Sequence, residues 1–374
     1  MNRLLFLISV FFLFSCRPDV HVDVVQTDGG CTDPYALNYS DLAVTDDGSC
    51  EYFVGTPYVV ETPLGFPEMP IPADNPMSVE GIALGRRLFY EGLLSGDNQQ
   101  SCFDCHRSIR GFGDPNRFSF GITGARGDRN PSTIINAAWQ DAQFWDGRAA
   151  SLEEQALGPV TNPIEMNSPS WAVVVDKLKA HDEYPALFLE AFGTADFDSS
   201  HVVKAIAQFE RTFISGNSKY DQWQRGELEL TESEHRGREL FFTEKADCFQ
   251  CHPPPLFTDN LYHNNGLDEP PFADMGRANV TENYLDEAAF KTPTLRNIEF
   301  TAPYMHDGRF EELFMVVNHY NSGGKASHSL DPLMKHQGVG LNLSETEQED
   351  LINFLKTLSD LDFLNNPDFF DPEL

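Results

Sequence analysis

Apolar residues recur at helical spacing in several segments of the chain. A capping box, in which Ser344 stands three residues before Glu347, precedes one such segment and predicts the start of a helix. Thr231 and Glu234 form a second capping box, which opens another predicted helix. The two clearest apolar stripes are Leu351, Phe354, Leu355 and Leu358, and Val202, Ile206, Phe209 and Phe213. No stretch alternates convincingly between apolar and polar residues as a strand does, so we expect a mainly α fold with long loops.

The chain repeats one series of short motifs, which indicates an internal duplication. The first series comprises Gly85-Arg86-Arg87-Leu88-Phe89, Arg129-Asn130-Pro131-Ser132-Thr133 and Phe144-Trp145-Asp146-Gly147-Arg148. The second comprises Gly237-Arg238-Glu239-Leu240-Phe241, Thr292-Pro293-Thr294-Leu295-Arg296-Asn297 and Met305-His306-Asp307-Gly308-Arg309. We therefore predict two lobes of related fold, residues 77–225 and residues 226–374.

Each copy also contains a Cys-x-x-Cys-His run, which is the attachment pattern of a c-type haem. The runs are Cys102-Phe103-Asp104-Cys105-His106 and Cys248-Phe249-Gln250-Cys251-His252. In this pattern the two thiols bind the porphyrin and the histidine donates an imidazole nitrogen to iron. A zinc knuckle would need further ligands nearby, but Cys248 lies 146 positions after Cys102. A redox disulfide would not need the histidine. We therefore predict two covalently bound haems, one in each cytochrome-c-like lobe, with His106 and His252 as iron ligands.

The first residues have the features of a bacterial export signal. Arg3 provides the positive charge, and the apolar run from Leu4 to Phe14 is too short to span a bilayer. The sequence Leu13-Phe14-Ser15-Cys16 resembles a lipobox, which predicts a signal peptide at residues 1–15 and acylation of Cys16. An ordinary soluble export signal is the alternative. Both interpretations place the chain outside the cytoplasmic membrane, and the first anchors it by lipid at the periplasmic side of a membrane or at the cell surface.

Two cysteines remain after lipid and haem attachment, Cys31 and Cys50. An oxidising compartment favours a disulfide between them. They enclose an Asp-rich segment, and six prolines follow between Pro57 and Pro76, which is typical of an extended linker. Residues 16–76 are therefore predicted to form a disulfide-bonded spacer and a linker.

The formal net charge of −32 makes nucleic acid an improbable partner. An acidic surface suits attraction of a small basic electron carrier. It suits plain solubility equally well, and charge alone does not decide between the two.

The repeat allows the far sides of the two haems to be compared. Asp307 lies 161 positions after Asp146, and this offset sets Tyr320 opposite Pro159. Proline has no atom to donate to iron, whereas a tyrosine oxygen can ligate it. The first haem is therefore predicted to have an open face and the second to be closed by Tyr320. Three neighbours of Tyr320 offer more usual ligand types for c-type cytochromes: Met315, His319 and Met334.

Several segments resemble the bacterial di-haem cytochrome c peroxidases, over roughly residues 70 to 360. The resembling segments are Gln143-Phe144-Trp145-Asp146-Gly147-Arg148, Leu152-Glu153-Glu154-Gln155-Ala156, Asn162-Pro163-Ile164-Glu165-Met166, Pro293-Thr294-Leu295-Arg296-Asn297 and Ala302-Pro303-Tyr304-Met305-His306-Asp307-Gly308-Arg309. The resemblance implies a peroxidatic haem in the N-terminal lobe and an electron-accepting haem in the C-terminal lobe. It also implies that hydrogen peroxide is reduced with electrons from a small cytochrome or a cupredoxin, and dimers are usual in that family.

The same resemblance implies roles for individual residues. It places Trp145 between the haems as an electron relay and gives Glu165 the acid–base role above the open iron. It assigns Gln155 and Pro159 to the lining of the distal pocket. It implies a calcium ion held by Asn130 and by the carbonyls of Thr301 and Pro303. The structural alternatives are a packing role for Trp145 and an exposed position for Glu165.

Two features depart from the family pattern. Many of those peroxidases carry a histidine in the loop before the Arg-Asn-Pro motif, but residues 120–126 contain none. They also use methionine on the C-terminal haem, where this chain has Tyr320. Both departures resemble the di-haem enzyme that matures methylamine dehydrogenase by oxidising tryptophans of a partner protein. A protein-modifying oxidase is therefore a second hypothesis, and an electron-transfer cytochrome with two six-coordinate irons is a third.

Overall fold

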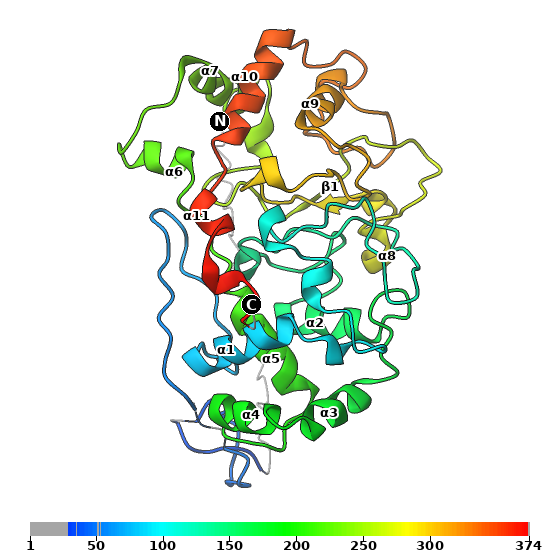
Figure 1. Cartoon of the computed structure of the whole chain (residues 1–374). Helices are drawn as coiled ribbons and strands as arrows, with labels where there is room; N and C mark the ends of the chain where they lie inside the picture. The colour runs from blue at the N-terminus through cyan, green and yellow to red at the C-terminus, as the bar shows by residue number, and fades with distance from the viewer. Residues whose placement is uncertain (1–28, 35, 51, 53, 373–374) are drawn as a thin grey trace, which may run out of the picture. The chain divides into compact units, whose positions relative to one another are not determined.

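The computed structural model describes residues 29–34, 36–50, 52 and 54–372 (Figure 1). The chain divides into two compact units, one up to residue 53 and one from residue 54. The predicted signal peptide and Cys16 lie outside the described residues. The boundaries at residues 76/77 and 225/226 stay predictions. No helix in the described part of the chain has the length and apolar character needed to cross a membrane.

The first unit is held by a disulfide between Cys31 and Cys50, which confirms the predicted pairing. Short backbone pairings, including Gly30 with Asp46, connect its two halves. The Asn38 amide donates a hydrogen bond of 2.6 Å to the carbonyl of Ser49. This small unit therefore depends on a covalent bond and a few polar contacts, as expected for a segment too short to bury a core.

The second unit is mainly helical, as predicted, with a single antiparallel pair of short strands among residues 54–372. Its helices are α1 (Val79–Phe89), α2 (Leu152–Thr161), α3 (Trp171–Ala180), α4 (Tyr184–Phe192), α5 (Ser199–Glu210), α6 (Lys219–Gln224), α7 (Glu232–Phe241), α8 (Ala278–Thr281), α9 (Leu313–Ser322), α10 (Glu345–Lys356) and α11 (Leu361–Leu364). The strands are β1 (Tyr262–His263) and β2 (Phe290–Lys291). Short 3₁₀ turns occur at Gly92–Leu94, Cys102–Asp104, Ser108–Arg110, Ala137–Trp139, Cys248–Gln250, Tyr284–Asp286, Ile298–Phe300 and Pro367–Phe369.

Both predicted capping boxes form. The Thr231 hydroxyl accepts from the Glu234 amide at the start of α7, and Glu234 accepts from the Thr231 amide at 2.7 Å. Ser344 and Glu347 make the same exchange at the start of α10. The apolar stripes extend past the helix ends: α5 stops at Glu210, before Phe213, and α10 stops at Lys356, before Leu358. Both residues are still buried, because the chain turns inward after each helix.

Two helix pairs, α1 with α5 and α7 with α10, form the centres of the unit (Figure 1). A glycine lies at each crossing. A Cβ atom on Gly85 would overlap the carbonyl oxygen of Ala205, and one on Gly237 would overlap that of Asp350. The missing side chains therefore let each pair approach closely. The matching position of the glycines supports the duplication inferred from the motifs.

Replacing either crossing glycine by alanine is expected to destabilise the protein by about 1–3 kcal/mol, because the added methyl group must push two backbones apart. The midpoint of thermal unfolding, followed by circular dichroism, measures the effect of Gly85→Ala and Gly237→Ala. Gly127→Ala serves as the control, because its Cβ would lie 3.7 Å from the nearest atom, the Arg129 carbonyl oxygen. Equal midpoints for all three variants would show that the crossings tolerate a side chain.

The offset of 161 positions also appears in the backbone. Helices α2 and α9 begin and end at residues related by it, Leu152 and Leu313 at one end and Thr161 and Ser322 at the other. Left-handed residues recur with the same offset: Asn136 and Asn297 at φ 54° and 57°, Phe144 and Met305 at 67° and 73°, and Gly147 and Gly308 at 68° and 61°. Pro159 and Tyr320 therefore occupy equivalent helical positions.

Candidate haem sites

The two Cys-x-x-Cys-His runs have the same local structure. Each begins with a 3₁₀ turn, and the histidine amide donates to the carbonyl of the first cysteine at 3.0 Å in both. Nδ1 of His106 lies 2.9 Å from the carbonyl of Phe112, and Nδ1 of His252 lies 2.9 Å from that of Phe257. A histidine that donates from Nδ1 keeps Nε2 as an acceptor, which is the arrangement of metal-ligating histidines. Burial lowers the pKa of both imidazoles, so the neutral form that binds a metal is favoured.

The two carbonyl groups are aimed at the histidines by an unusual backbone conformation. Phe112 and Phe257 adopt left-handed φ values of 57° and 54°. Such values are strained for a bulky residue, by about 1–3 kcal/mol each. The same strain at equivalent places in both lobes indicates that orientation of His106 and His252 is the reason for it.

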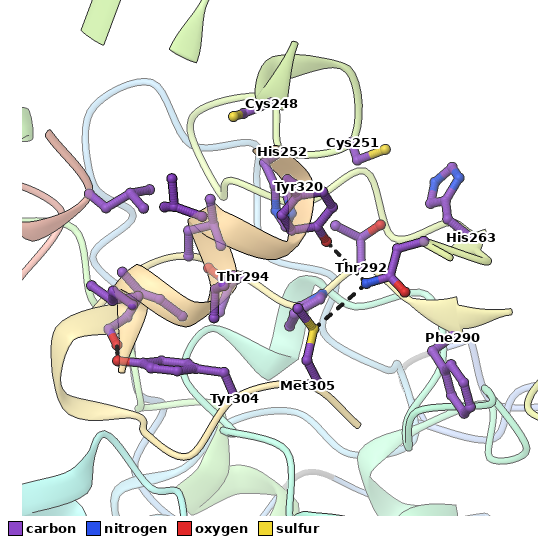
Figure 2. Close-up of a pocket in the computed structure, with 18 of the residues that line it drawn as sticks. Cys248, Cys251, His252, His263, Phe290, Thr292, Thr294, Tyr304, Met305 and Tyr320 are labelled. Carbon is purple, nitrogen blue, oxygen red and sulfur yellow. Dashed lines mark hydrogen bonds between the residues drawn. The ribbon is translucent and has the colours of Figure 1, made fainter. Parts of the chain in front are cut away.

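The second run opens into a cavity of about 250 Å³ (Figure 2). Cys248, Cys251 and His252 lie on its wall, and so does Tyr320 from α9. The rest of the wall is largely apolar, including Leu295, Ile298, Val317, Leu341, Leu351 and Leu355. Two thiols, one neutral imidazole and apolar walls are the features that a covalently attached porphyrin needs, so the residues present fit a haem c.

The hydroxyl of Tyr320 contacts the side-chain amide of Asn265 in this cavity. Nδ2 of Asn265 donates to the Tyr320 hydroxyl at 3.2 Å, and a dashed line at the labelled Tyr320 marks this bond in Figure 2. Burial raises the pKa of Tyr320 to about 12. Among its rivals, Met315 is 42% exposed and does not line the cavity, and Nε2 of His319 is 3.1 Å from the carbonyl of Asn265. Met334 does lie on the cavity wall, so both Tyr320 and Met334 stay candidates for the second protein ligand of this haem.

Glu165 lies beside the first Cys-x-x-Cys-His run. Its Oε1 accepts a hydrogen bond of 2.8 Å from the Asn162 amide, and burial raises the pKa of its carboxyl group. Gln100 connects this run to the neighbouring loop, because its Nε2 lies 3.7 Å from Sγ of Cys105 and donates to the carbonyl of Phe120 at 3.1 Å. The loop without a histidine packs on Glu165, because the Ile122 amide donates to the Glu165 carbonyl at 3.0 Å.

Helix α2 leads directly to Glu165. The carbonyl of Pro159 accepts from the amide of Met166 at 3.3 Å, so Pro159 and the residue after Glu165 are in contact. Gln155 is half-buried one turn earlier on the same helix, on the face that it shares with Pro159. The structure thus brings Pro159 and Glu165 together and puts Gln155 next along the helix.

Trp145 lies where segments of the two lobes meet. Its indole Nε1 donates to the carbonyl of Asn130 at 2.7 Å, and its own carbonyl accepts from the Lys291 amide at 2.7 Å. Its side chain lines the same cavity as Tyr320. His306, 161 positions later, is buried and stacks on Phe290 with ring centroids 3.6 Å apart.

Asn130, Thr301 and Pro303 all lie on the wall of this cavity. Nδ2 of Asn130 donates to the carbonyls of Asn116 and Arg117 at 3.1 and 3.2 Å, which leaves Oδ1 as the atom available to a cation. No hydrogen bond from a described residue reaches the carbonyls of Thr301 or Pro303. Neutral oxygen donors of this kind suit calcium, so the chemistry of the three residues fits the ion that the sequence resemblance implies.

Two contacts of His263 with carboxylates were not indicated by any sequence pattern. Nδ1 of His263 is 2.6 Å from Asp331 and Nε2 is 2.9 Å from Asp259. Although burial opposes it, the two carboxylates raise the pKa of His263 to about 12. A ring nitrogen of His263, a carboxylate oxygen of Asp259 and the sulfur of Cys251 lie within 4.8 Å of one another. His263 therefore lies between two carboxylates at the edge of the second haem site. Asp259 lies only four positions before His263, so its contact could have been considered from the sequence. No sequence pattern connects Asp331 with His263.

Comparison with known proteins finds relatives over most of the chain. A model of the di-haem cytochrome c peroxidase family matches residues 79–229. The chain is 38% identical over 293 residues to methylamine utilization protein MauG of Methylorubrum extorquens, covering 78% of this chain and 81% of that protein. It is 36% identical over 325 residues to cytochrome-c peroxidase IdrP1 of a Pseudomonas species, covering 78% and 84%. The crystal structure of a MauG-like protein associated with microbial copper homeostasis superposes with a TM-score of 0.79 at 35% identity, covering 85% of this chain and 100% of the other.

Proposed function

Because this chain belongs to the di-haem cytochrome c peroxidase family, we propose that it reduces hydrogen peroxide to water with electrons from a small cytochrome c or a cupredoxin. The observation that carries the proposal is the asymmetry between α2 and α9. Pro159 and Tyr320 occupy equivalent positions, and one of them has no atom to bind iron. With Pro159 on one side and Tyr320 on the other, one haem would keep a face for peroxide and the other would only pass electrons.

Membership of the family implies two c-type haems. Cys102 and Cys105 would hold the first and His106 its iron, while Cys248, Cys251 and His252 would hold the second. When bound, haem supplies the iron at which peroxide coordinates and through which electrons arrive. We propose Tyr320 as the second protein ligand of the C-terminal haem.

Glu165 is proposed to move the proton of peroxide. Its Oε1 is held by the Asn162 amide, which leaves the other carboxylate oxygen to take a proton from the oxygen nearer the iron and return it to the leaving oxygen. The raised pKa of Glu165 brings the group closer to working pH, which favours transfer in both directions. Gln155 and Pro159 would line the space above the iron and limit what enters it. In total, one peroxide takes up two electrons and two protons and yields two waters.

Trp145 is proposed as the relay between the haems. Its indole is fixed by the Asn130 carbonyl and the residue lines the C-terminal cavity, so Trp145 would offer an aromatic path for electrons that leave the second haem. A calcium ion at Asn130, Thr301 and Pro303 would stabilise the same region. The net charge of −32 suits a basic donor protein.

The ferric protein is expected to show one high-spin and one low-spin haem, and to turn over peroxide without prior reduction. The reason is that no histidine is available from residues 120–126 to block the first iron. Electron paramagnetic resonance of the purified protein and a steady-state assay started from the fully oxidised state measure both. A wholly low-spin spectrum with no binding of cyanide would favour the electron-transfer alternative, in which both irons are six-coordinate.

A protein-modifying oxidase is the second candidate function. Tyr320 and the loop without histidine favour it, since both depart from the usual peroxidase pattern. The two functions differ in the source of electrons. Fast turnover with a small cytochrome donor supports the peroxidase, whereas peroxide consumption that depends on oxidation of a partner protein supports the alternative.

The location of the protein is also a proposal. Acylation of Cys16 would anchor it by lipid on the periplasmic side of a bacterial membrane or at the cell surface, and the Cys31–Cys50 disulfide is consistent with an oxidising compartment. Mass spectrometry of the mature N-terminal peptide tests this, since an unmodified Cys16 would contradict it. Size-exclusion chromatography with light scattering tests whether the chain forms the homodimer usual in its family.

A further inference from the structure

The two related segments contact each other reciprocally. The amide of Asn130 donates to the carbonyl of His306, and the amide of Lys291 donates to that of Trp145, both at 2.7 Å. Lys291 and His306 lie 161 positions after Asn130 and Trp145 respectively. Each contact is therefore the image of the other under a local pseudo-two-fold axis. Any group bound on one side of this axis has an equivalent place on the other.

The three residues of the proposed calcium site have counterparts under this relation. The counterpart of Asn130 is Lys291, and those of Thr301 and Pro303 are Gln140 and Ala142. These counterparts also meet in space. Nζ of Lys291 donates to the carbonyl of Ala142 at 2.6 Å and to Oε1 of Gln140. The duplicate site is thus assembled, and an ammonium group from the chain lies in it.

The Asn130 site and the Lys291 site differ in the group that supplies the positive charge. Lys291 is only 5% exposed, and its Nζ donates to the carbonyl of Ala142, which is the counterpart of the Pro303 carbonyl, and to the side-chain oxygen of Gln140, which is the counterpart residue of Thr301. Asn130 is shorter and neutral, and no hydrogen bond from a described residue reaches the carbonyls of Thr301 and Pro303. Burial lowers the pKa of Lys291 to about 7, while Asp146 and Asp141 oppose that shift. The charge is therefore costly to bury, and the oxygens around it offset that cost.

We propose that the ammonium of Lys291 replaces a divalent cation at the duplicate of the Asn130 site, and that an asparagine at position 291 opens a second calcium site. The proposal rests on the calcium ion of the proposed function. It implies that each of the two equivalent sites needs one positive charge. Calcium supplies it at Asn130, and the lysine supplies it at position 291. The oxygens of Gln140 and Ala142, with water, provide the neutral donors that calcium requires.

The test is to count calcium in Lys291→Asn. The di-haem protein is treated with EDTA, equilibrated with calcium chloride and analysed by mass spectrometry for metal per chain. We expect one calcium in the natural protein and two in the variant, with a thermal midpoint that rises on calcium addition by more than it does in the natural protein. Lys291→Met, which removes the charge and offers no oxygen, should bind one. An unchanged count of one in Lys291→Asn overturns the proposal.

The reciprocal variant decides the question if Lys291→Asn does not fold. Asn130→Lys should carry its own ammonium, bind no calcium and have a thermal midpoint insensitive to EDTA. Retention of calcium in Asn130→Lys would contradict the equivalence of the two sites. A natural protein that binds no calcium at all would overturn the proposal while leaving the peroxidase function intact, since peroxide turnover is assayed separately. Covalent haem content, measured by absorption, verifies that each variant is assembled.

Discussion

Glu165→Gln is expected to lower the rate of peroxide reduction by about 10²- to 10⁴-fold, while both haems stay attached. Glutamine keeps the shape of the side chain and its contact with the Asn162 amide, but it cannot take and return a proton. The loss should therefore appear in turnover and not in haem content or thermal stability. Stopped-flow mixing with peroxide, followed by absorption, measures the first step directly. A variant with unimpaired rates would remove Glu165 from the mechanism.

The control for this change is Glu190→Gln, which removes an exposed carboxylate from α4 in the same lobe. It should leave turnover unchanged. The pH dependence adds an independent check. Glu165 must be deprotonated to accept a proton, so the rate should fall as pH drops through its pKa. Because burial raises that pKa, the fall should begin at a higher pH than for an ordinary glutamate, and it should be absent from the residual rate of Glu165→Gln.

Local patterns in the sequence were sufficient to predict much of the fold. The two capping boxes form because their partners are three residues apart, and the Cys-x-x-Cys-His runs become turns for the same reason. The internal repeat allowed one prediction beyond local patterns. The offset between its motifs predicted that Pro159 and Tyr320 occupy equivalent positions. The helix ends were less predictable: apolar spacing continues beyond Glu210 in α5, but Phe213 is buried by a turn and not by the helix.

Contacts between distant parts of the chain could not be predicted in this way. Asn265 meets the Tyr320 hydroxyl from 55 positions away, and Asp331 meets His263 from 68 positions away. Lys291 donates to Ala142 across 149 positions. Each pair is set by tertiary packing, and neither partner has a local pattern that indicates the other. Lys291 gave no signal on its own, because its significance emerges only when the reciprocal contacts reveal its counterpart.

The choice between Tyr320 and Met334 determines what the second haem does. Methionine raises the reduction potential of a c-type haem relative to ligands that donate more charge, so a tyrosine oxygen would make this haem harder to reduce. Replacing Tyr320 by phenylalanine removes the oxygen and keeps the ring. If Tyr320 is the ligand, Tyr320→Phe should lose the low-spin signal and show two high-spin haems. The natural protein should show one high-spin haem and one low-spin haem.

Tyr304→Phe is a matched control, since Tyr304 lines the same cavity but directs its hydroxyl to the carbonyl of Ile298 at 2.9 Å (Figure 2). It should leave the low-spin signal intact. If Met334 is the ligand instead, Tyr320→Phe will keep the spectrum and Met334→Leu will convert it, so the pair of variants distinguishes these two candidates. Ligation of the iron by Tyr320 would also explain why the amide of Asn265 points at the Tyr320 hydroxyl. This amide donates to the hydroxyl at 3.2 Å, and a donor at that distance stabilises negative charge on the oxygen, which is the form that binds ferric iron.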